Sequence, residues 1–223
     1  MKRVGYLSAQ FTGITALVLL LAACAGGPPA PDWQVGAKGF MERAVNDFLE
    51  GNPRAASAEF AKARLDLSST GRPDLIATAE LLRCASRVAS LVFEACTGFE
   101  PLRQDASAPL RAYADYLAGR LQPQEAVLLP PAQLAAAAPE ADVTVLESMP
   151  DPLSRLVAAG VMFRTGRASP AIIALAVDTA SSQGWRRPLL AWLGVQARLA
   201  EQAGQVPEAA RLRRRMELTQ LPH

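Results

Sequence analysis

Cys24 closes a short apolar segment near the start of the chain and is the first residue whose chemistry stands out. Lys2 and Arg3 precede this segment, which covers residues 11–23 and is shorter than the roughly 20 apolar residues that span a bilayer. Its length and charge predict an export signal rather than a permanent membrane helix. The small residues before Cys24 leave the backbone open to a peptidase, and the Cys24 thiolate is the nearby nucleophile that can carry a thioether-linked lipid.

The tetrapeptide Leu21-Ala22-Ala23-Cys24 resembles the lipobox of bacterial lipoproteins. The resemblance implies cleavage between Ala23 and Cys24, with diacylglycerol and an N-acyl group attached to Cys24. Several acyl chains form a stable membrane anchor, whereas one chain binds reversibly. Ala25 stands where an aspartate tends to retain such lipoproteins in the inner membrane, so the resemblance implies the outer membrane, facing the periplasm. The alternatives are an ordinary secretory signal with an incidental Cys24, or an uncleaved N-terminal anchor.

Cys84 and Cys96 are the other two cysteines, and after export they would occupy an oxidising compartment. On one continuous helix their separation would be about 18 Å, beyond the Cα distance of about 4.4 to 6.8 Å that a disulfide requires. Residues 77–92 have a helical pattern and Gly98 follows as a breaker. A helix that ends near Phe93 and then reverses therefore predicts a Cys84–Cys96 disulfide. Two buried free thiols are the alternative, and a catalytic pair is disfavoured.

Two tryptophans and two arginines surround the start of a predicted helix: Trp185, Arg186, Arg187 and Trp192. Trp and Arg are enriched at binding hot spots, so this group is a candidate partner-binding surface. The alternative is that Trp192 belongs to the core and Trp185 covers the turn, since indoles bury well at helix junctions. Further along, a basic stretch could approach anionic lipid or an acidic protein, or simply form a solvated helix face: Arg211, Arg213, Arg214 and Arg215.

Residues suited to catalysis are scarce. The only histidine is the last residue, His223, which argues against a Ser-His triad, a Cys-His pair or a histidine-rich metal site. Carboxylates such as Glu42 and Asp47 fall on polar helical positions, where solvent exposure is the expected role. We therefore expect no enzyme activity, no metal and no dissociable cofactor. Cleavage of the signal would remove Lys2 and Arg3 and take the formal charge from +2 to about zero, which gives a nucleic-acid partner no electrostatic support.

Apolar and small residues recur at helical spacing through the rest of the chain, which predicts an all-α fold. The Gly- and Pro-rich start predicts a flexible tether over residues 24–37, followed by one helical domain over residues 38–223. Prolines make residues 122–152 irregular, and residues 142–146 are expected to form a helix or an extended connector. Helices are otherwise predicted at residues 39–49, 53–67, 73–93, 108–119, 131–138, 152–164, 170–183, 187–203 and 207–218.

A short internal repeat links parts of this helical region. A glycine stands five residues before an alanine at three places: Gly51 and Ala56, Gly166 and Ala171, and Gly204 and Ala209. The first of these units resembles a tetratricopeptide repeat in its spacing of large, small and aromatic residues: Phe40, Ala44, Gly51, Ala56, Phe60 and Ala63. The resemblance implies antiparallel helix pairs stacked into an α-α superhelix. Arg213 occupies a position expected to be apolar, so an irregular helical bundle is the alternative.

An anchored, nearly neutral helical body predicts a non-enzymatic protein that scaffolds or regulates a cell-envelope complex. Its membrane contact is the lipid, which raises the effective concentration of the domain near an envelope protein partner. The family resemblance suggests envelope assembly, pilus or secretion machinery, or regulation of peptidoglycan synthesis. The alternative function is a helical domain that encloses a small molecule or lipid in an apolar pocket. The sequence leaves the oligomeric state and the partner's identity open.

Overall fold

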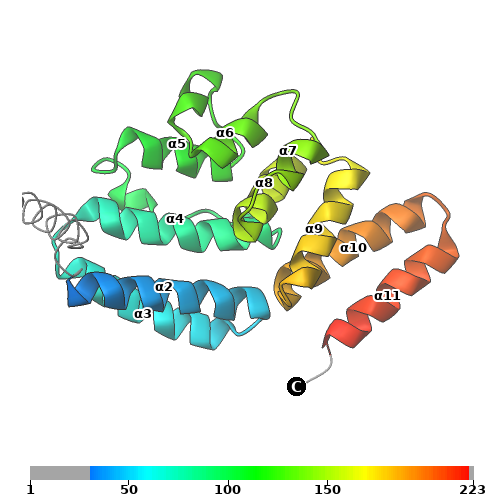
Figure 1. Cartoon of the computed structure of the whole chain (residues 1–223), viewed down its shortest axis with the longest axis horizontal. Coiled ribbons are helices and arrows are strands. Elements are labelled where there is room, and N and C mark those ends of the chain that lie inside the picture. Colours follow the sequence, from blue (N-terminus) through cyan, green and yellow to red (C-terminus); the bar gives the residue numbers. More distant parts are fainter. Residues whose placement is uncertain (1–30, 221–223) are drawn as a thin grey trace, which may run out of the picture. The chain divides into compact units, whose positions relative to one another are not determined.

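Helices account for nearly all of the regular structure in the described part of the chain. The structure is a computed structural model and describes residues 31–220. The predictions made for the export signal, for lipidation at Cys24 and for His223 therefore lie outside the described residues. Within residues 31–220 there is no strand, which confirms the all-α class (Figure 1). One compact unit of the chain begins at Trp33.

The helices follow one another through short links, apart from longer connections on either side of η2 and around η3. Their bounds are α2 (Asp32–Glu50), α3 (Pro53–Ser68), α4 (Pro73–Ala89), α5 (Ala108–Leu117), α6 (Pro131–Ala137), α7 (Val143–Glu147), α8 (Pro152–Arg164), α9 (Pro170–Ser182), α10 (Arg186–Gln202) and α11 (Val206–Gln220). Two 3-10 helices, η2 (Glu100–Leu102) and η3 (Pro123–Leu128), lie between α4 and α6.

The first helix begins earlier than the sequence predicted. Residues 32–37 were assigned to the tether, but α2 starts at Asp32, directly after the last proline of that segment. Asp32 lies in the first turn, where a carboxylate interacts favourably with the helix dipole. Ala37 is buried, and Trp33 packs against the same small core. These contacts extend the helix through the end of the predicted tether.

The helix that carries Cys84 is shorter than predicted, because α4 ends at Ala89 rather than near Phe93. Leu91 has a left-handed φ of 58°, which turns the chain back on itself. The backbone N–H of Val92 donates to the carbonyl of Arg87 at 2.9 Å and closes the reversal. Residues 143–147, predicted as a helix or connector, form α7, whose N-cap Asp142 accepts a hydrogen bond from the Thr144 amide.

Prolines and glycines set most of the boundaries. Proline occupies the first turn of most helices, where its missing N–H costs nothing. The repeat glycines after α2, α8 and α10 all have positive φ, but so do Gly71 after α3 and Gly184 after α9. The glycine spacing therefore marks helix ends in general. In the repeat units Ala56 and Ala209 are buried, whereas Ala171 is exposed, so the middle unit does not place its alanine at a helix interface.

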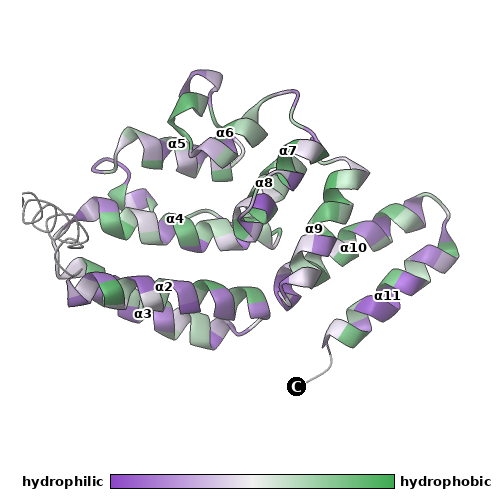
Figure 2. Ribbon diagram, in the orientation of Figure 1, coloured by the Kyte–Doolittle hydropathy of each residue, from purple (hydrophilic) through white to green (hydrophobic). Residues whose placement is uncertain are grey.

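The main hydrophobic core lies among α4, α5, α8, α9 and α10, with contributions from the shorter helices and α11. A smaller core joins α2 and α3 to one face of α4: Ala37, Met41, Ala44, Phe60, Ala63, Leu67 and Ala79. Thus α4 lies between the α2–α3 pair and α5, and it contributes to both cores (Figure 1). Figure 2 shows that apolar and polar residues are interspersed along the helices.

Helices α4 and α8 approach each other closely at Gly160. A side-chain methyl group at this position would lie 2.4 Å from the carbonyl oxygen of Val88. Position 160 requires glycine because the backbone of α4 leaves no room for a side chain, and not because of the φ angle of Gly160.

Candidate functional site

The two arginines predicted to bind a partner are half-buried and donate hydrogen bonds to α2. Arg186 Nε donates to the carbonyl of Glu50 at 2.9 Å, and Arg187 Nε donates to the carbonyl of Phe48 at 2.9 Å. The Arg187 guanidinium also lies 4.4 Å from the centre of the Phe48 ring. Both arginines start α10 and satisfy carbonyl groups at the C-terminal end of α2. We call this pair of contacts the α2–α10 latch.

The two tryptophans of the same group differ in their exposure. Trp192 is fully buried, its Nε1 donates to the carbonyl of Ala89 at 3.0 Å, and its ring meets Phe163 edge to face. Trp185 is half-buried and packs against the main core. Trp192 therefore belongs to the core, as the alternative for this group expected, whereas Trp185, Arg186 and Arg187 remain partly exposed and their binding role stays a prediction. The contacts of Arg186, Arg187 and Trp192 join α10 to α2 and α4, which the local sequence does not reveal.

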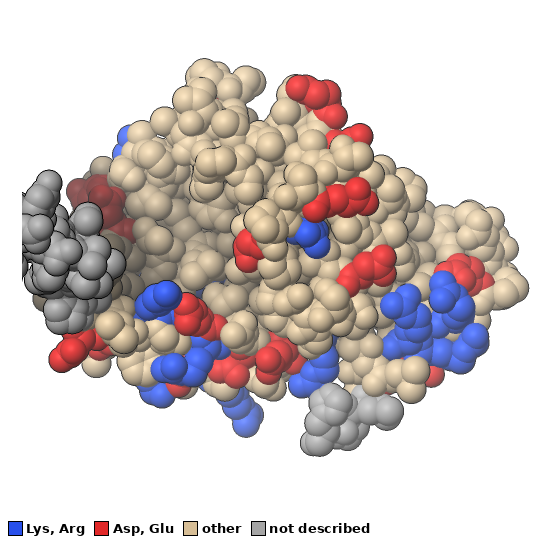
Figure 3. Space-filling model, in the orientation of Figure 1, with Lys and Arg blue, Asp and Glu red and all other residues tan. Residues whose placement is uncertain are grey.

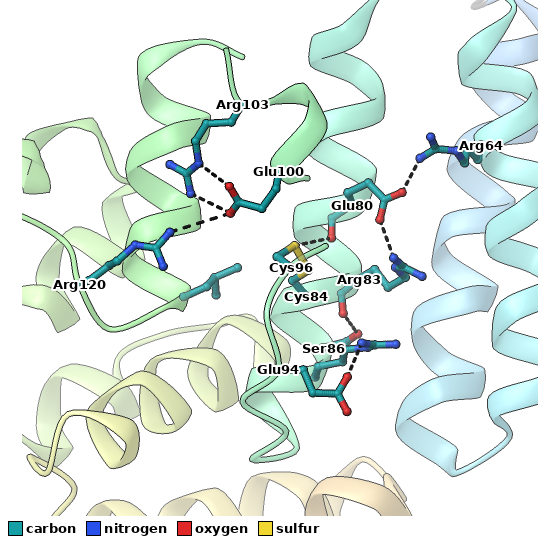
Figure 4. Close-up of a disulfide and its surroundings, with 12 residues drawn as sticks. Arg64, Glu80, Arg83, Cys84, Ser86, Glu94, Cys96, Glu100, Arg103 and Arg120 are labelled. Carbon is teal, nitrogen blue, oxygen red and sulfur yellow. Dashed lines mark hydrogen bonds and ion pairs between the residues drawn. A yellow bond between two sulfur atoms is a disulfide. The ribbon is translucent and has the colours of Figure 1, made fainter. Parts of the chain in front are cut away.

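Cys84 on α4 and Cys96 after the chain reversal are joined by a disulfide, with a Cα separation of 5.9 Å (Figure 4). The predicted pairing is confirmed. The bond ties the segment that follows the reversal at Leu91 back onto α4. Neither cysteine is free to act as a nucleophile in this state.

A buried carboxylate next to the disulfide was not predicted. Glu80 is only 2% exposed, and it accepts hydrogen bonds from Arg64 and, at 2.8 Å, from Arg83 Nη2 (Figure 4). A methyl group at Gly98 would lie 2.0 Å from Glu80 Oε2, so the disulfide-bound segment packs directly on this carboxylate. The two guanidiniums thus pair with both oxygens of Glu80, and removal of either arginine would leave the buried carboxylate less well compensated.

A second ion-pair network lies beside the disulfide. Arg103 Nε contacts Glu100 Oε2 at 2.9 Å, and Arg103 Nη2 contacts Asp115 Oδ1 at 3.2 Å. Hydrogen bonding from the Arg103 guanidinium lowers the pKa of Glu100, and the same pairing raises the pKa of Arg103. Glu100 and Arg103 therefore stay charged near neutral pH, which fits a structural role for this pair.

A groove between α9, α10 and α11 is the strongest candidate for an interaction site. Its volume is about 530 Å³. Apolar side chains from all three helices line it, including Ile173, Leu199 and Leu212, with Arg215 at its edge. Leu199 is 41% exposed, so part of the apolar lining faces solvent. The groove is formed by the last three helices, where Pro170, Gly184 and Gly204 set the helix ends.

The arginines on α11 give this region a basic surface. Figure 3 shows blue side chains gathered over the C-terminal helices. Arg211 pairs with Glu208 at 2.6 Å and lowers the pKa of that carboxyl group, and Arg213 pairs with Glu201 at 2.6 Å. Arg214 and Arg215 have no ion-pair partner within residues 31–220. Of these two arginines, Arg215 lines the groove, where it also interacts electrostatically with Glu208.

Other classes of site find no support in the described part of the chain. Residues 31–220 contain no cluster of three or more His, Cys, Asp or Glu side chains that could hold a metal ion. None of their helices has both the length and the hydropathy needed to cross a membrane. In the comparisons with known proteins, no family model, no curated protein and no solved structure matches the chain.

Proposed function

We propose that the chain is a lipid-anchored, periplasm-facing lipoprotein of the bacterial outer membrane that binds a cell-envelope protein through the α9–α11 groove. The lipobox-like Leu21-Ala22-Ala23-Cys24 supports the anchor, with acyl groups on Cys24. The antiparallel helix pairs, and the tetratricopeptide-like spacing of the α2–α3 pair, support a non-enzymatic scaffold or regulator. In this role the lipid concentrates the domain near membrane partners.

The observation that carries the binding proposal is the partly exposed apolar groove with Arg215 in its lining. Leu199 supplies exposed apolar area, and Arg215 supplies positive charge in a lining that also holds Asp178 and Glu208. Arg214 on the same helix has no ion-pair partner within residues 31–220. Such a surface complements a segment that presents apolar residues flanked by Asp or Glu. A helix or extended peptide of that composition is the partner we propose.

Site-specific photocrosslinking in intact cells tests the groove. A photoreactive amino acid replaces Leu199 in the groove, and in a matched control it replaces Leu65, which is 72% exposed on α3. We expect a discrete crosslinked protein from position 199 and none of the same mass from position 65. The double variant Arg214→Glu and Arg215→Glu should reduce the yield, whereas Arg54→Glu on α3 should not. Equal capture from both leucine positions would argue against the groove.

The anchor is tested separately with Cys24→Ala. The wild-type chain should be processed and should fractionate with the outer membrane, and the variant should lose lipid labelling. If the variant is labelled with palmitate like the wild type, the lipobox interpretation is wrong.

A further inference from the structure

A second cavity lies away from the groove, among α5, η3, α6 and α8. Its volume is about 390 Å³, within the range of sites that bind small molecules. The walls are mostly apolar: Leu121, Ala126, Leu134, Ala137, Pro139 and Val161. Leu134 is 41% exposed, which places an apolar residue where the cavity meets solvent.

Two polar side chains in the cavity wall, Tyr116 and Arg167, have hydrogen-bond donors that no other described residue uses. Tyr116 is 2% exposed, and its hydroxyl has no hydrogen-bond partner among the described residues. Burial raises the pKa of Tyr116, so the hydroxyl keeps its proton and can donate. Arg167 also lines the cavity, and no carboxylate within residues 31–220 lies at ion-pair distance from it.

The Arg167 guanidinium is held in place by the end of α6. Nη1 donates to the carbonyl of Ala138 at 2.9 Å, and Nη2 donates to the carbonyl of Ala136 at 3.1 Å. Each of these nitrogens carries a second hydrogen, so the group can still donate to another acceptor. The two carbonyls thus hold the guanidinium in place, and no carboxylate within residues 31–220 pairs with its positive charge.

We propose that this cavity binds a single-chain amphiphile with one carboxylate, such as a long-chain fatty acid. The apolar chain would lie between η3 and α6, and the carboxylate would accept hydrogen bonds from Arg167 and Tyr116. One guanidinium matches one negative charge, and charge-assisted hydrogen bonds are the strongest that such a site can offer. The inference does not depend on the α9–α11 groove or on a protein partner.

Photolabelling tests the site in the full chain, reconstituted in phosphatidylcholine nanodiscs. The probe is palmitic acid that carries a diazirine on its chain, and mass spectrometry locates the labelled peptides. We expect labelling within residues 116–139 and 161–167. Unlabelled palmitic acid should compete about tenfold better than hexadecanol, which has the same chain without the charge.

Cavity-filling variants provide the control. Ala137→Trp places an indole in the cavity, whereas Ala135→Trp places one on an exposed position of the same helix, outside the cavity lining. The first should reduce labelling about tenfold, and the second should leave it within about twofold. Ala126→Trp fills the cavity from η3 and replaces Ala137→Trp if circular dichroism shows that the latter is unfolded. Labelling unchanged in folded Ala137→Trp or Ala126→Trp protein, or equal competition by acid and alcohol, would overturn the proposal.

Discussion

Replacing Gly160 with alanine should destabilise the protein although alanine is the better helix former. In the middle of a helix this replacement is normally favourable by about 1 kcal/mol. At position 160 the new methyl group would lie 2.4 Å from the Val88 carbonyl oxygen and 3.0 Å from its carbonyl carbon. Both are backbone atoms of α4, so relief requires α4 and α8 to move apart.

Two opposing contributions set the expected change in the free energy of unfolding for Gly160→Ala. Overpacking in a well-packed core costs about 1 to 3 kcal/mol, and a clash with backbone belongs at the upper end of that range. After the gain in helix propensity, we expect Gly160→Ala to lower the free energy of unfolding by about 1 to 2 kcal/mol. Gly194→Ala in α10 is the matched control, because its methyl group meets only Met216 Cε at 3.8 Å. That variant should be more stable than wild type by up to about 1 kcal/mol.

Urea unfolding of the oxidised protein, followed by far-ultraviolet circular dichroism, measures both effects. The midpoint should fall for Gly160→Ala and rise for Gly194→Ala, with similar m-values. A Gly160→Ala protein at least as stable as wild type would refute the claim that α4 and α8 meet through their backbones at this point.

Three further predictions concern the disulfide, the core and an ion pair. Cys84→Ser together with Cys96→Ser should lower the free energy of unfolding by about 2 to 3 kcal/mol, because a short loop is no longer closed; unchanged thermal denaturation would contradict this. Trp192→Phe removes the donor to the buried carbonyl of Ala89 and should cost about 1 to 3 kcal/mol in denaturant unfolding, and a smaller loss would mean that water replaces the indole. Because Arg103 lowers the pKa of Glu100, the stability from this pair is complete above the ordinary carboxyl pKa of about 4.3 and is lost as pH falls below it. Glu100→Gln should therefore reduce the loss of stability between about pH 5 and pH 3, and identical pH profiles would argue against the pair.

Most helix boundaries were predictable because they depend on local chemistry. Proline is favoured in the first turn and glycine tolerates a left-handed φ, so Pro152, Pro170 and Gly184 define ends within a residue or two. The Cys84–Cys96 pairing was also predictable, since it required only a reversal after one helix. The start of α2 was missed because packing of Trp33 and Ala37 extends the helix into the expected tether.

Contacts between distant parts of the chain were not predictable from one sequence. Arg187 and Phe48 look like unrelated surface and core residues until the fold brings them together. From the sequence, Glu80 is expected to be an ordinary exposed carboxylate on a helix. The structure shows that it is buried under Gly98 and paired with Arg64. The same holds for the cavity around Tyr116, which is formed by four separate segments.

The α2–α10 latch has a consequence for how the protein unfolds. The α2–α3 pair shares only a small core with α4, and the latch ties its far end to α10 across more than a hundred residues of chain. Because few buried contacts hold this pair, it should be a local unfolding unit whose opening costs less free energy than global unfolding. Amides of α2 and α3 would then exchange with deuterium sooner than those of α4 and α8, and loss of Arg186 and Arg187 would widen that difference.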